Sequence, residues 1–193
     1  MQGVLLVVCG PSGVGKGTIN KKLLDSQDNL INSVSATTRV PRNNEIEGKD
    51  YYYISEENFL QMLKNDEFLE WAKVHGYYYG TPKKPVFKAL KNGFNVLLEI
   101  DVQGALQIKD SYSRSILIFL KPPTMEELER RLRLRGTEDE DEIKRRLKTA
   151  EWEMTMIHKF DYDIINDKVD DTYQKVLDIL AEHKEYNKRC REC

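Results

Sequence analysis

Residues Gly10–Thr18 read GPSGVGKGT and directly follow the apolar run Val4–Cys9, which is typical of a buried β-strand. The stretch fits the pattern G-x-x-x-x-G-K between this strand and a predicted helix, Lys16–Ser26, which is the context of a phosphate-binding loop. In such a loop the backbone N–H groups turn inward around phosphate oxygens, and the helix start adds the positive end of its dipole. The candidate phosphate-binding residues are Gly10, Pro11, Ser12, Gly13, Val14, Gly15, Lys16, Gly17 and Thr18.

Position 17 departs from the usual form of this loop. A serine or threonine normally follows the lysine and binds magnesium, whereas this chain has Gly17. Thr18 comes next, but neighbouring helical residues point about 100° apart, so its hydroxyl cannot simply replace one at position 17. We therefore assign no side chain as a direct metal ligand and expect Mg²⁺ to depend on nucleotide phosphates, water and more distant carboxylates.

The rest of the chain alternates predicted strands and helices. Asn95–Ile100, Ser115–Leu120 and Asp163–Ile165 are short apolar runs of the kind found in buried parallel strands. Thr124 begins a capping-box pattern, and two helical faces follow, formed by Ile143, Leu147, Ala150, Met154 and Ile157, and by Tyr173, Val176, Leu177 and Leu180. This alternation predicts an α/β fold, with a three-layer α/β/α core around a parallel sheet.

Between the first helix and residue 95 the pattern changes. Most of the ten tyrosines fall here, at 51–53 and 77–79, among short alternating runs such as Tyr51–Ile54 and Phe68–Val74 that are typical of antiparallel strands. We expect residues 33–93 to form an inserted domain with its own small mixed sheet, and residues 1–32 and 94–193 to form the core. The acidic segment Gly136–Glu142 is predicted to be a loop, within a short lid at about residues 135–145.

Composition excludes several classes of protein. The 193 residues suit one α/β domain with appended pieces, and 30 Lys and Arg against 32 Asp and Glu give a net charge of −2, so neither nucleic acid nor an acidic membrane is an expected partner. No apolar run approaches the roughly 20 residues of a membrane span, and no secretory signal pattern is present. The odd cysteine count is no disulfide framework. Cys190 and Cys193 form a terminal CREC, for which a redox-active pair and half of a metal site are less favoured than an inert tail. A reducing cytoplasm is the expected compartment.

The inserted region carries residues suited to a second phosphate ligand. SATTRVPR places Arg39 and Arg42 three residues apart, and guanidinium groups suit a phosphate monoester. FLEWAKVHGYYYGT adds a carboxylate, a phenol and a hydroxyl, while LLEID ends a predicted strand in Glu99 and Asp101 near the loop. The alternatives are surface charges and sheet packing for the insertion, and capping of the helix Val102–Lys109 for Asp101.

These segments resemble the guanylate kinases over nearly the whole chain. GPSGVGKGT, SVSATTRVPR, EGKDYYYIS, FLEWAKVHGYYYGT, LLEIDVQGA and RLRLRGTE occur in the order of that family. The resemblance implies transfer of the γ-phosphoryl group from ATP·Mg²⁺ to GMP, giving ADP and GDP. It implies GMP contacts from Ser35, Arg39, Arg42, Tyr51, Glu70, Tyr79, Thr81, Glu99 and Asp101, catalytic roles for Lys16, Arg39, Arg135 and Arg146, and a place near the adenine for Asn166.

Elementary chemistry supports this assignment for Glu70. Guanine offers its N1–H and N2–H donors side by side to a carboxylate, whereas adenine would present a lone pair at N1, and an unmatched buried carboxylate costs several kcal/mol. Because a phosphate monoester has a second pKa of about 6, GMP is already largely a dianionic nucleophile at neutral pH, and no general base is needed. The histidines His75, His158 and His183 therefore have no predicted role, and Arg130, Arg131, Arg133 and Arg145 are expected to be solvated helix charges.

Two other interpretations stay open from sequence alone. A different nucleoside monophosphate kinase would share the loop and differ in its base pocket. A guanylate-kinase-like interaction module would bind peptides without catalysis, although such modules typically have a degraded loop, and Gly10, Gly15 and Lys16 are intact here. ATP and GMP are the expected ligands and dGMP is a further candidate acceptor, while the oligomeric state is not predicted.

Overall fold

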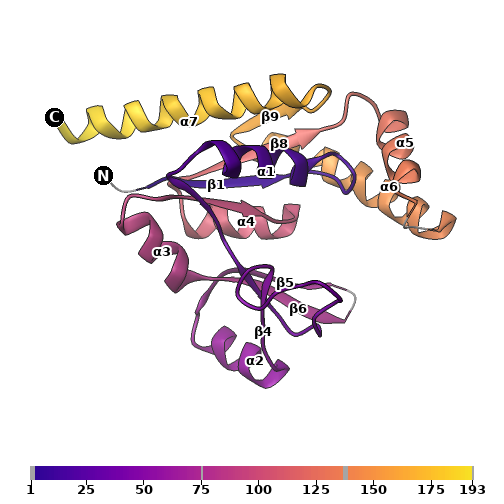
Figure 1. Cartoon of the computed structure of the whole chain (residues 1–193), viewed down its shortest axis with the longest axis horizontal. Helices are drawn as coiled ribbons and strands as arrows, with labels where there is room; N and C mark the ends of the chain where they lie inside the picture. The colour runs from indigo at the N-terminus through magenta and orange to yellow at the C-terminus, as the bar shows by residue number, and fades with distance from the viewer. Residues whose placement is uncertain (1–2, 75, 137–138, 193) are drawn as a thin grey trace.

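The computed structural model describes residues 3–74, 76–136 and 139–192, with side chains as far as His183, and contains two separate sheets (Figure 1). The larger sheet is entirely parallel and has the order β2-β7-β1-β8-β9. Its strands are β1 (Leu5–Cys9), β2 (Leu30–Asn32), β7 (Asn95–Glu99), β8 (Ser115–Lys121) and β9 (Tyr162–Ile165). The chain moves to one side of β1 for β2 and β7 and to the other for β8 and β9. The carboxyl end of β1 therefore lies at a switch point, where parallel sheets bind ligands.

Helices cover both faces of this sheet, as the alternating pattern predicts. Successive residues of β1 point to opposite faces, so Leu6 and Val8 belong to one apolar cluster and Leu5 and Val7 to another. The first cluster includes residues of α1 (Lys16–Ser26) and α7 (Val169–Glu192), and the second includes residues of α3 (Lys83–Lys91) and α4 (Val102–Ser111). Figure 1 shows α1 and α7 above the sheet and α3 and α4 below it. The predicted three-layer α/β/α core is confirmed.

The smaller sheet has the order β4-β3-β6-β5 and is formed by β3 (Ser35–Thr37), β4 (Tyr51–Tyr53), β5 (Phe68–Val74) and β6 (Tyr77–Pro82). Helix α2 (Glu56–Lys64) contributes Phe59 to its apolar cluster, where this ring stacks on Phe68 with centroids 4.4 Å apart. Strands β5 and β6 are antiparallel as predicted. The prediction that Tyr51–Ile54 is antiparallel is wrong, because β4 pairs in parallel with β3. Parallel neighbours begin at the same end of a sheet, so β3 and β4 are joined by a long connection and not by a tight hairpin.

Two further helices, α5 (Met125–Arg135) and α6 (Glu140–Thr155), project beside the phosphate loop and are followed by the short 3₁₀ helix η1 (Ile157–Lys159) (Figure 1). Thr124 caps α5 as predicted, because its hydroxyl accepts a hydrogen bond from Glu127 N–H at 3.1 Å. The predicted acidic loop is shorter than expected, since Asp139 caps α6 and residues 140–142 form its first turn. Carboxylates are favourable at this end of a helix dipole. Residues 137 and 138 lie outside the described residues. The predicted helical face extends along α6 as far as Met154, whereas its last member, Ile157, lies in η1.

Across the described stretches 3–74, 76–136 and 139–192, no helix combines the length and apolar character that a bilayer crossing requires.

Candidate active site

The phosphate loop joins β1 to α1 and folds around its own lysine. Gly15 caps α1 with a φ of 102°, a left-handed conformation that favours glycine, and a Cβ there would lie 2.6 Å from the Asn166 side-chain nitrogen. The Lys16 ammonium donates to Gly10 O at 2.6 Å and to Pro11 O at 3.2 Å. The loop therefore surrounds a positive charge next to the start of a helix, an arrangement suited to phosphate.

The far side of the loop rests on Asn166 and on an arginine for which the sequence predicts no such role. Asn166 is buried behind the loop, and its Nδ2 donates to Val14 O at 2.7 Å. The Arg131 Nη1 donates to Asn166 O at 2.9 Å and to Val14 O at 3.3 Å, while its Nε donates to Glu127 at 2.8 Å. The prediction that Arg131 is a solvated charge is therefore wrong, because it lies on the face of α5 that is turned toward the loop.

Helix α6 brings a second arginine to the loop. Arg146 Nη1 donates to Ser12 Oγ at 2.6 Å, and its Nε donates to Glu142 Oε1 at 3.0 Å. Arg135 is exposed at the last residue of α5, so only one of the two predicted catalytic arginines of this region contacts the loop within the described residues.

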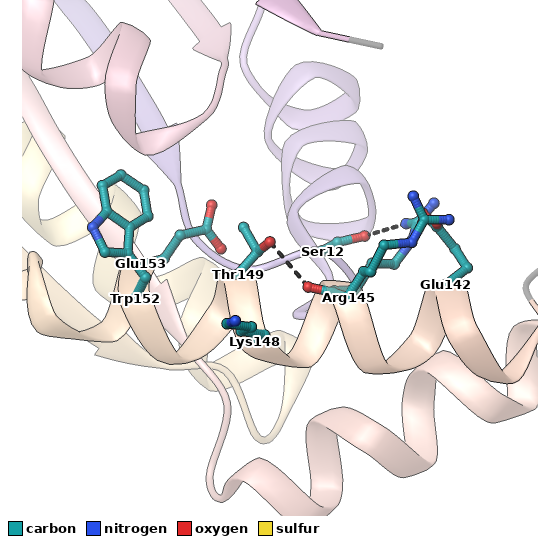
Figure 2. A pocket seen from close by; sticks show the side chains of 8 residues that line it. Ser12, Glu142, Arg145, Lys148, Thr149, Trp152 and Glu153 are labelled. Atoms are coloured by element: carbon teal, nitrogen blue, oxygen red, sulfur yellow. Dashed lines mark hydrogen bonds and ion pairs between the residues drawn. The ribbon is translucent and has the colours of Figure 1, made fainter.

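A cavity of about 660 Å³ lies between α6 and the loop (Figure 2). Its lining includes Ser12, Arg146, Thr149, Trp152 and Glu153. Glu153 is 7% exposed, and burial raises the pKa of its carboxyl to about 7 against the opposing charge of Lys16. Sequence reasoning missed this residue, because it stands in a helix rich in charged side chains.

A second cavity, of about 300 Å³, separates the small sheet from the carboxyl end of β7. Its lining includes six of the residues predicted to contact GMP, namely Ser35, Tyr51, Glu70, Tyr79, Glu99 and Asp101. Thr81 lies directly behind them, with its Oγ1 3.4 Å from Ser35 Oγ. The fold thus brings together residues that lie up to 66 positions apart, between Ser35 and Asp101.

Glu70 is the most deeply buried carboxylate of this cavity. Its side chain accepts a hydrogen bond from Thr81 Oγ1 at 2.6 Å. Burial raises the pKa of Glu70 to about 7, the nearby Asp101 charge adds to the shift, and the Thr81 hydrogen bonds oppose it. This hydrogen bond fixes Oε1 of the carboxylate, and the other oxygen, Oε2, lies beside Gly104 of α4.

Helix α4 forms the wall against which Glu70 packs. A Cβ at Gly104 would lie 2.6 Å from Glu70 Oε2, so only glycine leaves room there for the carboxylate. One helical turn later, the Gln107 amide accepts from Trp71 N–H at 3.1 Å and donates to Trp71 O at 2.9 Å. These contacts fix β5, which carries Glu70, against the core.

Both acids that follow β7 have partners in the core. Asp101 Oδ1 accepts from Gly104 N–H at 2.9 Å and caps α4, so the capping alternative is confirmed, although the residue also lines the cavity. Glu99 Oε2 accepts from Asn20 Nδ2 on α1 at 2.7 Å. These bonds connect the cavity wall to the helix that leaves the phosphate loop.

Arg39 lies at the other end of the small-sheet site in an ion pair. Its guanidinium donates to both Glu45 oxygens, at 2.8 and 3.0 Å, and lies 5.5 Å from the Tyr51 ring centre. Tyr53 Oη and Arg42 N–H also donate to Glu45, and the Arg39 hydrogen bonds lower the pKa of Glu45 to about 2. Sequence reasoning missed Glu45 and Tyr53, because contacts within this turn depend on the path of its backbone.

The histidines and cysteines take no part in either cavity among the described residues. His158 Nδ1 lies 2.9 Å from Thr155 O and His183 Nε2 lies 3.1 Å from Tyr162 Oη, while His75 lies outside the described residues. Cys9 is buried, which raises the pKa of its thiol, and Cys193 also lies outside the described residues. The described part of the chain contains no group of three His, Cys, Asp or Glu side chains that could hold a metal ion.

Comparisons with known proteins agree with this geometry. Residues 2–183 match the family model described as guanylate kinase. Proteins named guanylate kinase from Caldanaerobacter subterraneus subsp. tengcongensis and Clostridium tetani are 50% and 49% identical to this chain; each alignment covers 95% of it and 89% and 88% of the relatives. The crystal structure of guanylate kinase from Anaplasma phagocytophilum matches with a TM-score of 0.75 and 37% identity, over 94% of this chain and 86% of that one.

Proposed function

Because the chain belongs to the guanylate kinase family, and therefore phosphorylates GMP with ATP, we propose that it binds the two nucleotides on either side of the carboxyl edge of the large sheet. ATP lies on the loop Gly10–Thr18, and GMP lies in the cavity lined by the small sheet and the end of β7. The domain boundaries proposed are residues 1–32 and 94–193 for the core and 33–93 for the inserted GMP-binding domain. The buried carboxylate of Glu70 is the observation that carries the assignment of the GMP site.

Glu70 reads the guanine base. Thr81 holds one oxygen of the carboxylate, and two oxygens together can accept from guanine N1–H and N2–H. Ser35 and Asp101 line the same cavity and complete the polar contacts of the base, and Glu99 closes its wall. Adenine lacks these two donors and would leave the carboxylate unmatched.

The GMP phosphate binds Arg39, Arg42, Tyr51 and Tyr79. Arg39 already makes a two-point ion pair with a carboxylate, and the same guanidinium fork can donate to two oxygens of a phosphate. When the GMP phosphate binds this guanidinium, it displaces the Glu45 carboxylate. The arginine is held beside the Tyr51 ring, so the site is preorganised for an anion.

Catalysis requires alignment of the two substrates and electrostatic stabilisation of the transferred phosphoryl group, because the GMP phosphate is already an anionic nucleophile. Lys16 leaves the carbonyls of Gly10 and Pro11 for the terminal phosphates of ATP, and Arg39 holds the acceptor phosphate. Arg146, which contacts Ser12 of the loop, and Arg135 both bind the phosphoryl group during its transfer. Residues 135–145 act as the lid that keeps water out.

Mg²⁺ accompanies ATP in this proposal. Gly17 supplies no hydroxyl and has no atom within 4 Å of its ideal Cβ position, so the residues present fit an ion held by nucleotide phosphates and water. When bound, the ion supplies positive charge to the transferred group. Asn166 borders the base of ATP, and its Oδ1, which is buried without a hydrogen-bond partner among the described residues, is suited to an amino group. We further propose that the enzyme works in a reducing cytoplasm on ATP and GMP, without nucleic acid or membrane partners.

A panel of acceptors tests the GMP site. With ATP as donor, ADP release is measured for GMP, dGMP, AMP, UMP and CMP, using the wild-type protein, Glu70→Gln and, as a control, Glu57→Gln on the exposed face of α2. Glu70→Gln replaces one acceptor by a donor, so we expect kcat/KM for GMP to fall about 10- to 150-fold, corresponding to about 1.5–3 kcal/mol, while KM for ATP is unchanged. An unchanged kcat/KM for GMP would mean that the base binds elsewhere.

A further inference from the structure

The Glu153 carboxylate has no role in the site proposed above, yet it is buried next to the phosphate loop. It is 7% exposed and makes no hydrogen bond or ion pair with any residue in the described part of the chain. Figure 2 shows its side chain leaving α6 toward the segment that carries Ser12, and both residues line the same cavity. Ser12 belongs to the loop that follows β1, so the Glu153 carboxylate lies beside the carboxyl edge of the sheet, where the charges of Lys16 and Asp101 act on it.

An unpaired buried carboxylate destabilises a folded protein. Taking such a charge out of water costs several kcal/mol unless hydrogen bonds or a cation compensate, and burial has raised its pKa to about 7. A glutamine of the same shape would avoid this cost. The acid is therefore explained by a positively charged or hydrogen-bond-donating partner that arrives with the substrates.

Lys16, Glu99 and Asp101, the other charged groups considered at the carboxyl edge of the sheet, are already engaged. Glu99 accepts from Asn20, and one oxygen of Asp101 caps α4. Lys16 donates to two loop carbonyls. Glu153 is thus the least engaged carboxylate at this edge among the described residues.

The missing hydroxyl at Gly17 points to the identity of the partner. Without it, the ion that accompanies ATP keeps more of its water, and Mg²⁺ characteristically retains several water ligands. Those waters are strong hydrogen-bond donors, and a carboxylate across a cavity can accept from them without touching the ion.

We propose that Glu153 anchors the water shell of the nucleotide-bound Mg²⁺, and so replaces from α6 the support that a hydroxyl at position 17 would give. This inference rests on the proposed function, in which Mg²⁺ accompanies ATP on the loop. Glu153 positions the ion and its waters without direct coordination. Because α6 also carries Arg146, one helix would both hold the water shell of the ion and supply positive charge to the phosphoryl group.

Calorimetry with a non-hydrolysable ATP analogue, with and without Mg²⁺, tests this role. The proteins are the wild type, Glu153→Gln and a matched control, Glu151→Gln, which changes an exposed acid of the same helix. We expect Mg²⁺ to tighten analogue binding in the wild type and the control. In Glu153→Gln this gain should shrink about 10-fold or more, while binding without Mg²⁺ is unchanged or tighter because a negative charge is gone. Electron paramagnetic resonance of Mn²⁺ should show the same loss in ion affinity.

The outcomes separate this inference from the proposal beneath it. If Glu153→Gln keeps the full Mg²⁺ gain, the inference is overturned and the proposed function stands. If the wild type shows no gain, the role of Mg²⁺ itself fails. The melting temperature distinguishes a structural role, because removing an unpaired buried charge should raise it at pH 8. A lower melting temperature together with an unchanged Mg²⁺ gain would assign Glu153 to the core.

Discussion

Gly104→Ala is a small change outside the cavity that should impair GMP binding. The added Cβ would lie 2.6 Å from Glu70 Oε2 and 3.2 Å from its Cδ. To reach an ordinary contact of 3.4 Å the oxygen must move by about 0.8 Å. Thr81 holds the other oxygen at 2.6 Å, so the carboxylate must rotate about that bond and lose its alignment with the base.

The expected magnitude follows from one lost charge-assisted hydrogen bond. Such a bond contributes about 1.5–3 kcal/mol, which corresponds to an increase in KM for GMP of about 10- to 150-fold. The fold should survive, because overpacking costs about 1–3 kcal/mol and alanine in a helix recovers up to about 1 kcal/mol relative to glycine. KM for ATP should be unchanged, since α4 does not contact the loop through this residue.

A coupled assay of ADP release with GMP and ATP varied separately measures both constants, with thermal unfolding as the check on folding. Asp110→Ala, an exposed change on the same helix, serves as the control. Combining Gly104→Ala with Glu70→Gln should cost little more than Glu70→Gln alone, because the methyl group acts through that carboxylate. A normal KM for GMP in Gly104→Ala, or full additivity in the double variant, would refute this mechanism.

Three further predictions concern charge. Lys16→Ala should lower kcat by about three orders of magnitude, as loss of a preorganised charge at the reacting group does, while circular dichroism shows an intact fold; near-normal turnover would remove Lys16 from its role. GMP affinity should rise with pH up to about 7 as Glu70 ionises, and calorimetry from pH 6 to 8 should find this dependence weakened in Glu70→Gln. Because the native pKa of about 7 exceeds the ordinary 4.5, the folded protein holds this proton more tightly, so Glu70 should lower unfolding free energy as pH rises between these values. An unfolding profile that is identical in Glu70→Gln would contradict this sign.

Local patterns were enough to predict the core. The apolar run before GPSGVGKGT, the glycines and Lys16 specify strand, loop and helix in order, and the structure has α1 at Lys16–Ser26 as predicted. Alternation in Tyr51–Ile54 could not give the direction of β4, because side chains alternate in parallel and antiparallel strands alike. The acidic segment Gly136–Glu142 suggests a loop from its composition, although Asp139 and the acids after it are favourable at a helix start, and they form the cap and first turn of α6.

The candidate site was predictable where residues form compact motifs. Glu70 and Thr81 lie on neighbouring strands, and the structure pairs them directly. Arg131 and Glu153 were not recognisable, because a charged residue on a charged helix reveals its burial only when the face that it occupies is known. Glu45 was missed for another reason, since an ion pair within a turn depends on the path of the backbone between its partners.

A crystal structure of the protein with GMP and a non-hydrolysable ATP analogue tests the central claim most directly. We predict guanine N1 and N2 within hydrogen-bond distance of the Glu70 carboxylate, the GMP phosphate on Arg39 and Arg42, and the analogue's phosphates inside the loop with Lys16. A complex in which the guanine lies away from Glu70, or in which the small-sheet cavity holds no nucleotide at saturating GMP, would contradict the account.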